Sequence, residues 1–420
     1  MRAATRMFAA LSVLAICASG CATKASSSQD AGASGDVKTD VGVTDDTITL
    51  GVMTDLTSVF KPSGVAYSAG HELWAKDVNE AGGICGRDVE LDIRDHGYKP
   101  DNAFALYPQM LEQDLAIMDL LGSPILAALK PRIAADKFLT IAAAWASENL
   151  DTEAVLILGQ TYDIEMLNGL NFLAEEGMIA KGDKIGHIYV DSEYGLNANK
   201  GVKSYADQTG MTVVDAAVSA TDSDMTAIIA KLKSEGVSAI AVTTAPVASG
   251  SVLLQNTAQG LDVPILGSSP TFSIQLLSDQ GVVDAMQNFD IVGNADAFGT
   301  GTGNEVAAKV SEEYAATYSD PPDRGVMAGY VFGMAMQAIL EQACSNGDLT
   351  RDGLLKARKQ LDDIDTKGIT GNLDFSDPGA PTSREGFIFT IDPNAEVGIV
   401  VTRELYASDE AKAYKAPHEK

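Results

Sequence analysis

The chain has 420 residues, of which 45% are hydrophobic and 21% are charged, a composition that fits two soluble domains. Its formal net charge is −28, and such a chain repels phosphate backbones, so we expect no binding to nucleic acid. We interpret the acidity as an aid to solubility and salt tolerance outside the cell, not as a sign of the substrate.

The N-terminus has the pattern of a secretory signal. Arg2 and Arg6 precede an apolar run over residues 7–18 that is too short to span a bilayer stably. Small residues then lead to Cys21, and Ala18–Cys21 resembles the lipobox of bacterial lipoproteins. We therefore predict a lipoprotein signal peptide over residues 1–20 and a lipid anchor on Cys21, which would hold the protein outside the cytoplasm on the cell membrane. The alternative is that Cys21 is an ordinary cysteine after a cleaved signal.

Residues 21–47 are rich in Ser, Ala, Gly, Asp and Lys and contain almost no large apolar side chain. Such a segment cannot bury a core, so we predict a flexible tether. The folded part is then expected to begin near Ile48.

Four cysteines are present, and two of them belong to the N-terminal region. Cys17 would leave with the signal peptide and Cys21 would be acylated, which leaves Cys85 and Cys344 in an oxidising compartment. A disulfide between these two is the simplest prediction. The alternative is a pair of separate buried thiols.

Short runs of β-forming residues recur along the chain, each followed by a longer segment with helical spacing. In residues 65–78, for example, Leu73, Trp74 and Val78 fall on one helical face. Strand followed by helix at this rhythm predicts parallel α/β sheets. The predicted strands are residues 47–53, 88–94, 115–121, 138–142, 185–190, 212–218 and 239–242.

This pattern divides into two parts. Gly159, Gln160 and Thr161 interrupt it, and a helical pattern returns near Asn304. We expect an α/β fold of two lobes between which the chain crosses, rather than two domains in series. The first lobe is predicted to contain residues 48–158 plus 295–385, and the second residues 159–294 plus 386–420.

Motifs typical of enzymes are missing from the sequence. The four histidines are scattered without metal-ligand spacing, and no metalloprotease, nucleophile-elbow or phosphate-loop motif occurs. His96 beside Asp95 is interpreted as a polar residue of the lobe surface rather than as a general base. We therefore predict a protein that is not an enzyme and that needs no metal or cofactor.

Several motifs follow one another in a recognisable order. A strand and helix over residues 51–78 lead to the turn Asn79–Arg87, which reads Asn-x-x-Gly-Gly-Ile-x-Gly-Arg, and then to Asp95 and Pro100-Asp101. The chain thus resembles the branched-chain amino-acid-binding (Leu/Ile/Val-type) family of ABC transporter substrate-binding proteins. The later segments that carry this resemblance are residues 121–124, 142–147, 190–195 and 329–330.

The resemblance implies a type I periplasmic-binding-protein fold with two Rossmann-like lobes and a three-crossing hinge. It also implies that a small-molecule solute binds in the cleft, that the lobes close on it, and that the closed protein delivers it to ABC permease subunits in the membrane. A monomer is expected. The alternative function is that of an extracytoplasmic sensor or receptor domain with the same fold.

The resemblance places three candidate ligand-binding residues early in the first lobe. Phe60 follows the first strand where the family often has an aromatic residue over the ligand, or it packs on the surface. Ser123 and Pro124 follow a buried strand, where backbone N–H groups and the Ser123 hydroxyl would meet a ligand carboxylate. The alternative for Ser123 is a helix cap.

A third loop of the first lobe contains Ala144, Trp145 and Ser147. Relatives present backbone groups and a hydroxyl to the ligand here. Trp145 offers a rigid apolar face and an indole N–H, which favours a solute with a hydrophobic or flat aromatic part. The alternative is that Trp145 packs in the core.

On the second lobe, Tyr162 and Tyr194 are expected to close over the ligand, and Ser269 is expected to contact it.

Amino-acid-binding relatives usually place an acidic residue in the loop that here reads Gly267–Pro270, and this loop has none. An unpaired ammonium out of water costs several kcal/mol. We therefore expect a branched-chain amino-acid-like compound, an aromatic or aliphatic carboxylate, or an amide, with a standard amino acid disfavoured unless Asp163, Asp191 or Glu193 supplies the charge.

Overall fold

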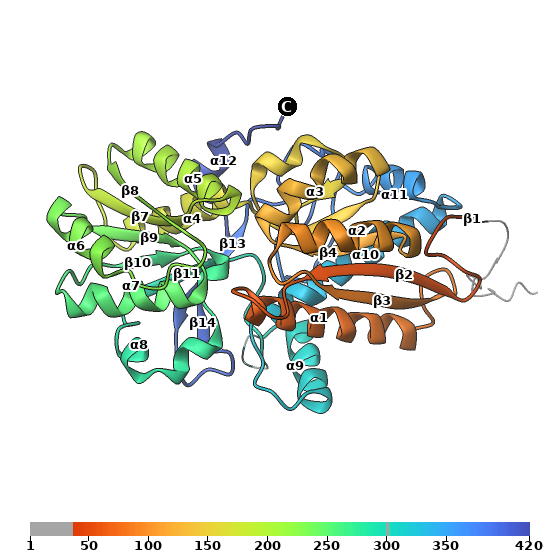
Figure 1. The fold of residues 1–420 in the computed structure, drawn as a ribbon, viewed down its shortest axis with the longest axis horizontal. Coiled ribbons are helices and arrows are strands. Elements are labelled where there is room, and N and C mark those ends of the chain that lie inside the picture. Colours follow the sequence, from red (N-terminus) through yellow and green to blue (C-terminus); the bar gives the residue numbers. More distant parts are fainter. Residues whose placement is uncertain (1–36, 300, 302) are drawn as a thin grey trace, which may run out of the picture. The chain divides into compact units, whose positions relative to one another are not determined.

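A computed structural model describes residues 37–299, 301 and 303–420 (Figure 1). The predicted signal peptide, Cys21 and most of the predicted tether lie outside these residues. Within the described range, the chain forms two large sheets covered by helices, and one short two-stranded pairing. None of the described helices is long and apolar enough to cross a membrane.

The first lobe is built on a parallel sheet with strand order β3-β2-β4-β5-β6. β4 reads AIMDLL and every residue of it is buried, which is typical of a strand covered on both faces. Its one carboxylate, Asp119, lies 3.1 Å from Nε2 of His71. The strands are β2 (Thr47–Thr54), β3 (Asp88–Asp95), β4 (Ala116–Leu121), β5 (Thr140–Ala143) and β6 (Val155–Leu156).

Helices from both ends of the chain cover this sheet. The earlier ones are α1 (Lys61–Glu80), α2 (Pro100–Gln113), α3 (Ser123–Asp136) and the short helix η1 (Ser147–Asp151). The later ones are α9 (Glu305–Thr317), α10 (Gly325–Ser345) and α11 (Arg351–Arg358). α2 begins after Lys99 with Pro100 in its first turn, so Asp101 lies inside the helix and is not its cap.

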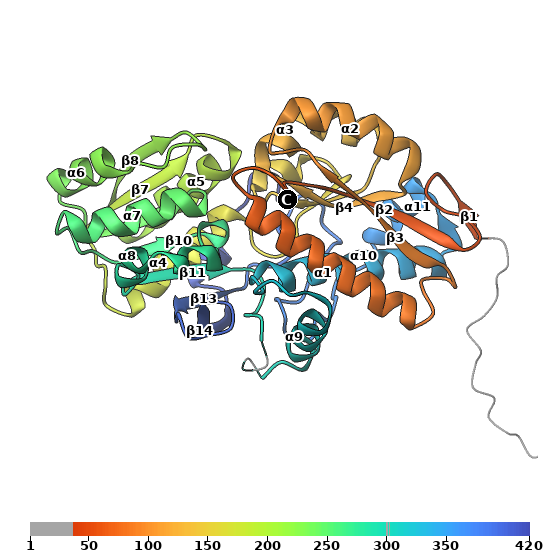
Figure 2. The ribbon, with the colours of Figure 1, turned by 60° about the horizontal axis from the view of Figure 1, so that its bottom comes forward.

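α1 and α10 lie side by side in both views (Figures 1 and 2) and approach until their backbones touch. A Cβ on Gly329 would lie 2.2 Å from the carbonyl oxygen of Tyr67, and one on Gly333 would lie 2.1 Å from Cγ of Trp74. Only glycine fits at such a contact. The two helices are therefore locked together as one packing unit.

The second lobe has a larger, mixed sheet with strand order β14-β13-β11-β10-β9-β7-β8. The pairings from β8 to β11 are parallel, whereas β13 and β14 are antiparallel additions at one edge. The strands are β7 (Lys184–Val190), β8 (Thr212–Val218), β9 (Ala239–Thr243), β10 (Ile265–Gly267), β11 (Phe289–Gly293), β13 (Gly386–Ile391) and β14 (Ile399–Tyr406).

The second lobe's helices follow its strands in the expected alternation. The α-helices are α4 (Tyr162–Glu175), α5 (Glu193–Thr209), α6 (Thr226–Glu235), α7 (Pro246–Ala258), α8 (Gln280–Asp284) and α12 (Asp409–Ala413). Two short 3₁₀ helices, η2 (Ser269–Thr271) and η3 (Ile274–Ser278), follow β10.

The described chain passes between the lobes three times, after β6, after β11 and before β13, and the crossings bond to one another. The N–H of Gly159 in the first crossing donates to Oγ1 of Thr382 in the third at 2.8 Å. Asn294 in the second donates from Nδ2 to the carbonyl oxygen of Gln160 at 3.2 Å. The hinge is thus a hydrogen-bonded stack of three segments.

The folded part begins earlier than Ile48, which corrects one sequence expectation. β1 (Lys38–Thr39) pairs in parallel with β12 (Asp348–Leu349), and Val43 forms a β-bridge with Ile48. Backbone pairing needs no large apolar side chains, so composition alone did not reveal it.

Cys344 lies at the end of α10, shortly before β12. It is bonded to Cys85 through a disulfide with a Cα–Cα distance of 6.2 Å.

Candidate functional site

A small cavity lies where the carboxyl ends of the first-lobe strands meet helix starts of the second lobe. Phe60 follows β2, Tyr98 follows β3 and Ser123 follows β4, so the cavity lies where parallel α/β sheets bind ligands. Its volume is about 20 Å³, room for about one water molecule. It is lined by Phe60, Ser63, Tyr67, Tyr98, Leu121, Gly122, Ser123, Ala143, Trp145, Tyr162, Tyr194 and Pro270.

Six of the twelve residues that line the cavity are aromatic. The ring centroid of Trp145 lies 6.0 Å from that of Tyr162 and 6.5 Å from that of Tyr67, both edge-to-face. The Trp145 N–H donates to the carbonyl oxygen of Leu158 at 2.8 Å. The indole therefore offers a solute its apolar face, while its N–H is used inside the protein.

The second-lobe phenols face this wall. The rings of Tyr162 and Tyr194 lie 4.5 Å apart, and the Tyr194 hydroxyl lies 2.5 Å from Oγ of Ser268. Burial raises the pKa of both phenols well above its usual value. Both therefore stay protonated at neutral pH, and the Tyr194 hydroxyl already shares a hydrogen bond with Ser268.

The start of α3 provides a polar end to the apolar cavity. Gly122 is the N-cap with φ of 111°, and a Cβ there would lie 2.8 Å from Cε2 of Tyr98. Ser123 occupies the first helical position and does not cap the helix. Its Oγ is buried and has no hydrogen-bond partner among the described residues. A helix N-terminus with a spare hydroxyl is a favourable place for a carboxylate.

Two acidic residues fix the loops that carry Phe60 and Tyr98. Asp55 accepts the N–H of Phe60 at 2.9 Å, and Asp95 accepts the N–H of Leu56 at 3.0 Å. His96, expected on the lobe surface, is instead fully buried, and its Nε2 lies 2.9 Å from the carbonyl oxygen of Leu121. Burial lowers the pKa of His96, so this imidazole is a neutral structural bridge between two strands.

A second cavity, of about 30 Å³, shares Ser63, Tyr67 and Trp145 with the first. Ser269 and Arg324 also line it. Nη2 of Arg324 donates across the cleft to the carbonyl oxygen of Ser269 and to its Oγ. The start of α10 thus holds the η2 segment of the second lobe.

Glu165 on α4 lies behind this contact. It is fully buried, and its Oε2 accepts the N–H of Ser269 at 3.1 Å. Burial raises the pKa of Glu165 to about 8, against the opposing effects of the Ser269 N–H and Arg324. The loop of residues 267–270 therefore has an acidic neighbour after all, but one that is mainly protonated at neutral pH.

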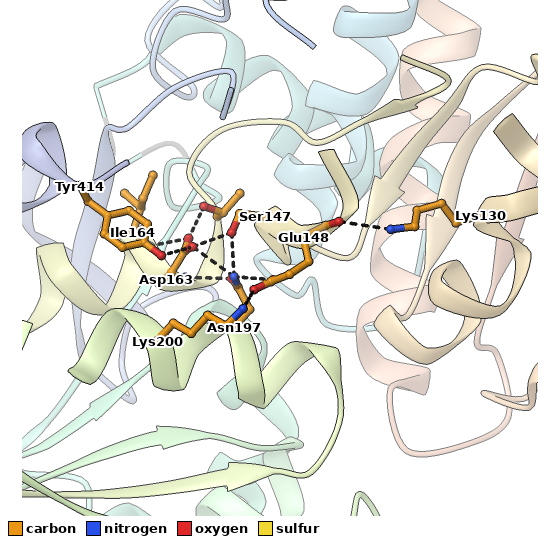
Figure 3. A network of polar contacts seen from close by, with 9 residues as sticks. Lys130, Ser147, Glu148, Asp163, Ile164, Asn197, Lys200 and Tyr414 are labelled. Atoms are coloured by element: carbon orange, nitrogen blue, oxygen red, sulfur yellow. Dashed lines mark hydrogen bonds and ion pairs between the residues drawn. The ribbon is translucent and has the colours of Figure 1, made fainter. Parts of the chain in front are cut away.

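A polar network joins η1 of the first lobe to α4, α5 and the C-terminal segment (Figure 3). Asp163 accepts the Ser147 hydroxyl at 2.6 Å and the Tyr414 hydroxyl at 3.0 Å. Asn197 donates to Oε2 of Glu148 at 2.7 Å. Burial raises the pKa of Asp163, and these hydrogen bonds oppose the shift. The Asp163 carboxylate is thus fully engaged in the network and is not free to pair with a solute.

The structure brings most of the predicted site residues together. Those that line the first cavity are Phe60, Ser123, Trp145, Tyr162 and Tyr194. Ser269 lines the second cavity, and Pro124 lines a larger groove beside the first. Ala144 and Ser147 are fully buried and are not part of the wall of either small cavity, so their contact with a ligand stays a prediction.

Sequence reasoning missed several residues of these walls. Ser63 and Tyr67 follow Phe60 at positions i+3 and i+7, a helical spacing that puts them on the same face and could have revealed them. Tyr98 follows a predicted strand, as the other loops do. Glu165 and Arg324 carried no local signal, because only the fold brings α4 and α10 to the same cleft.

Comparison with known proteins agrees with this architecture. The model of a periplasmic binding protein family matches residues 47–396, and no curated protein gave a significant match. A fatty acid ABC transporter substrate-binding protein from Thermomonospora curvata is 37% identical, with 91% of this chain and 97% of that chain covered and a TM-score of 0.87.

Two more distant structures share the fold. A branched-chain amino acid ABC transporter protein from Thermus thermophilus with bound valine is 17% identical, with 88% and 99% of the two chains covered and a TM-score of 0.75. A leucine-binding protein from Thermotoga maritima is 16% identical, with 86% and 99% covered and a TM-score of 0.73. The chain therefore belongs to the periplasmic binding protein family and is a substrate-binding protein of the ABC transporter type with the type I fold.

Proposed function

We propose that this protein captures a hydrophobic monocarboxylic acid of the fatty acid class outside the cytoplasm and delivers it to the permease of an ABC importer. The observation that carries the proposal is the cavity itself, half of whose lining residues are aromatic and which ends at the start of α3. There the Ser123 hydroxyl has no partner among the residues described. An apolar chain with one carboxylate matches both halves of such a site.

Similarity to the fatty acid protein of Thermomonospora curvata supports this class of solute. A standard amino acid fits less well. The carboxyl of Glu165 is protonated at neutral pH because burial raises its pKa to about 8, and Asp163 is engaged by Ser147 and Tyr414. Neither provides the free charge that a buried ammonium needs.

Capture requires the lobes to separate. A cavity of about 20 Å³ holds about one water molecule, so a larger solute enters only when the cleft opens. The hydrogen-bonded crossings provide a hinge, and the contact between Arg324 and Ser269 re-forms on closure. The closed protein is the form that the permease receives.

We also propose that Cys21 carries the lipid that holds the protein at the membrane. Mass spectrometry of the mature N-terminus checks this directly. An acylated Cys21 is expected, and a Cys21→Ala protein should leave the membrane fraction. An unmodified Cys21 in membrane-bound protein would contradict it.

The solute is tested by calorimetric titration of octanoate, octanamide, phenylacetate and valine into the mature protein. Octanoate should bind, octanamide should bind more weakly because it lacks the charge, and valine should not bind. Trp145→Ala and Ser123→Ala should each weaken octanoate binding by about tenfold or more, as truncation of a buried contact does. Ser234→Ala, on exposed α6, is the matched control. Strong binding of valine with none of octanoate would overturn the proposal.

A further inference from the structure

A groove of about 520 Å³ runs alongside the small cavity, and Tyr98 lines both. It lies between the first lobe, at Tyr98 and Pro124, and the second lobe, at the carboxyl ends of β7 and β8. Its volume is in the range of about 300 to 1,000 Å³ that is typical of small-molecule sites. The small cavity holds about one water, so the larger space is beside the site rather than in it.

The two spaces are joined at the start of α3. Ser123 lines the small cavity, and the next residue, Pro124, lines the groove. A carboxylate bound at Ser123 would therefore lie only one residue along the chain from the groove. Tyr98 is the side chain that stands between the two spaces.

Tyr98 is held in an unusual conformation. Its φ is 54°, in the left-handed region that few residues other than glycine adopt. Its ring lies 4.8 Å from that of Phe60 and packs on Gly122. Strained residues of this kind gather at ligand clamps. Rotation of this one side chain would connect the cavity with the groove.

The groove has an apolar floor, two lining serines (Ser192 and Ser219) and an acidic rim. Val190 and Val218 are buried, and Ala217 and Ala220 add apolar surface between them and solvent. Asp191 and Asp222 lie at the rim and are exposed. No basic residue is among the described residues that line the groove. The floor suits a hydrocarbon chain, and the rim repels a second negative charge.

We propose that this groove is a second subsite, which binds the distal part of the solute's acyl chain when Tyr98 turns aside and which excludes dicarboxylic acids. The inference rests on the proposed function, since the same molecule must place its carboxylate at α3. Residues of the second lobe would then determine which acyl-chain lengths and which charges the site accepts.

The test is a calorimetric series of butanoate, hexanoate, octanoate, decanoate and dodecanoate on the mature protein. Affinity should rise by about threefold to fourfold for each added methylene that enters the groove. Ala217→Trp fills the groove from an exposed strand position, so it should remove this length dependence and leave butanoate binding unchanged. Ala230→Trp, exposed on α6, is the matched control and should behave as the wild type.

The charge of the rim is tested with octanedioate. It should bind far more weakly than octanoate, and the Asp191→Asn/Asp222→Asn variant should narrow this difference by raising the affinity for octanedioate more than the affinity for octanoate. Equal dependence of affinity on chain length in wild type and Ala217→Trp would overturn the subsite. Equal affinity for octanoate and octanedioate would also overturn it. In both cases the proposed function would stand. Absence of binding by every acid would overturn the proposed function, and the subsite with it.

Discussion

Replacing Glu165 with Gln should make the stability of this protein less sensitive to pH. Glu165 is fully buried, with Oε2 accepting the Ser269 N–H and Oε1 without a partner in the described part of the chain. Gln keeps the acceptor and places an uncharged amide where the spare oxygen lies. The substitution therefore removes a titration with little change in shape.

The sign and size follow from the pKa of Glu165, which burial raises from 4.5 to about 8. Between these values the folded protein keeps a proton that the unfolded chain has lost. Folding then takes up a proton, so the free energy of unfolding falls as pH rises through this window. At about 1.4 kcal/mol per pH unit, the loss is on the order of 4 to 5 kcal/mol across the window. That is a large part of the total stability of about 5 to 15 kcal/mol of a typical domain.

Urea unfolding of wild type and Glu165→Gln at about pH 5, 6.5 and 8 measures the effect. The free energy of unfolding of the variant minus that of wild type should rise by on the order of 4 kcal/mol from pH 5 to pH 8. Glu112→Gln, exposed on α2, is the control and should run parallel to wild type. If the curves of Glu165→Gln and wild type are also parallel, Glu165 is ionised in the folded protein and the reasoning is wrong.

Other substitutions test the helix packing, the disulfide and the polar network around Asp163. Gly333→Ala should lower the free energy of unfolding by about 1 to 3 kcal/mol, because the new Cβ would lie 2.1 Å from Cγ of Trp74, and an unchanged urea midpoint would contradict the helix contact. Cys85→Ser/Cys344→Ser should cost about 2 to 5 kcal/mol, since the bond closes a sequence separation of 259 residues, yet calorimetry should show unchanged octanoate affinity. Asp163→Ala should cost about 1 to 3 kcal/mol by leaving buried donors unpaired, and stability equal to wild type would refute its structural role.

The fold could be predicted from the sequence because its signals are local and repeated. Alternating strand and helix patterns gave the α/β class, the interruption at Gly159–Thr161 marked the first crossing, and the family comparison confirms the two-lobed type I architecture. The antiparallel pair β13 and β14 was not anticipated. Its strands come from the far end of the chain, so nothing in their own sequence shows which sheet they join.

Part of the cavity wall was predicted from the sequence, and the wall residues that were missed have a common cause. Loops after strands were found because the carboxyl edge of a parallel sheet is a general binding place, and Phe60, Ser123 and Trp145 lie there. Ser147 was assigned to the solute because it belongs to the same loop, and its hydroxyl donates to Asp163. Glu165 was missed because a carboxylate in mid-helix gives no sign of the partner loop it packs against.

The strand order has a consequence for how the protein is made. β11 pairs on one side with β10 and on the other with β13, which begins at Gly386, far beyond β11 in the chain. The first lobe likewise needs α10, which ends at Ser345. Neither lobe has a continuous stretch of chain that contains all of its packing partners, so the first stays incomplete until α10 has emerged and the second until β13 has emerged. An open strand edge at β11 invites association with other chains during that interval.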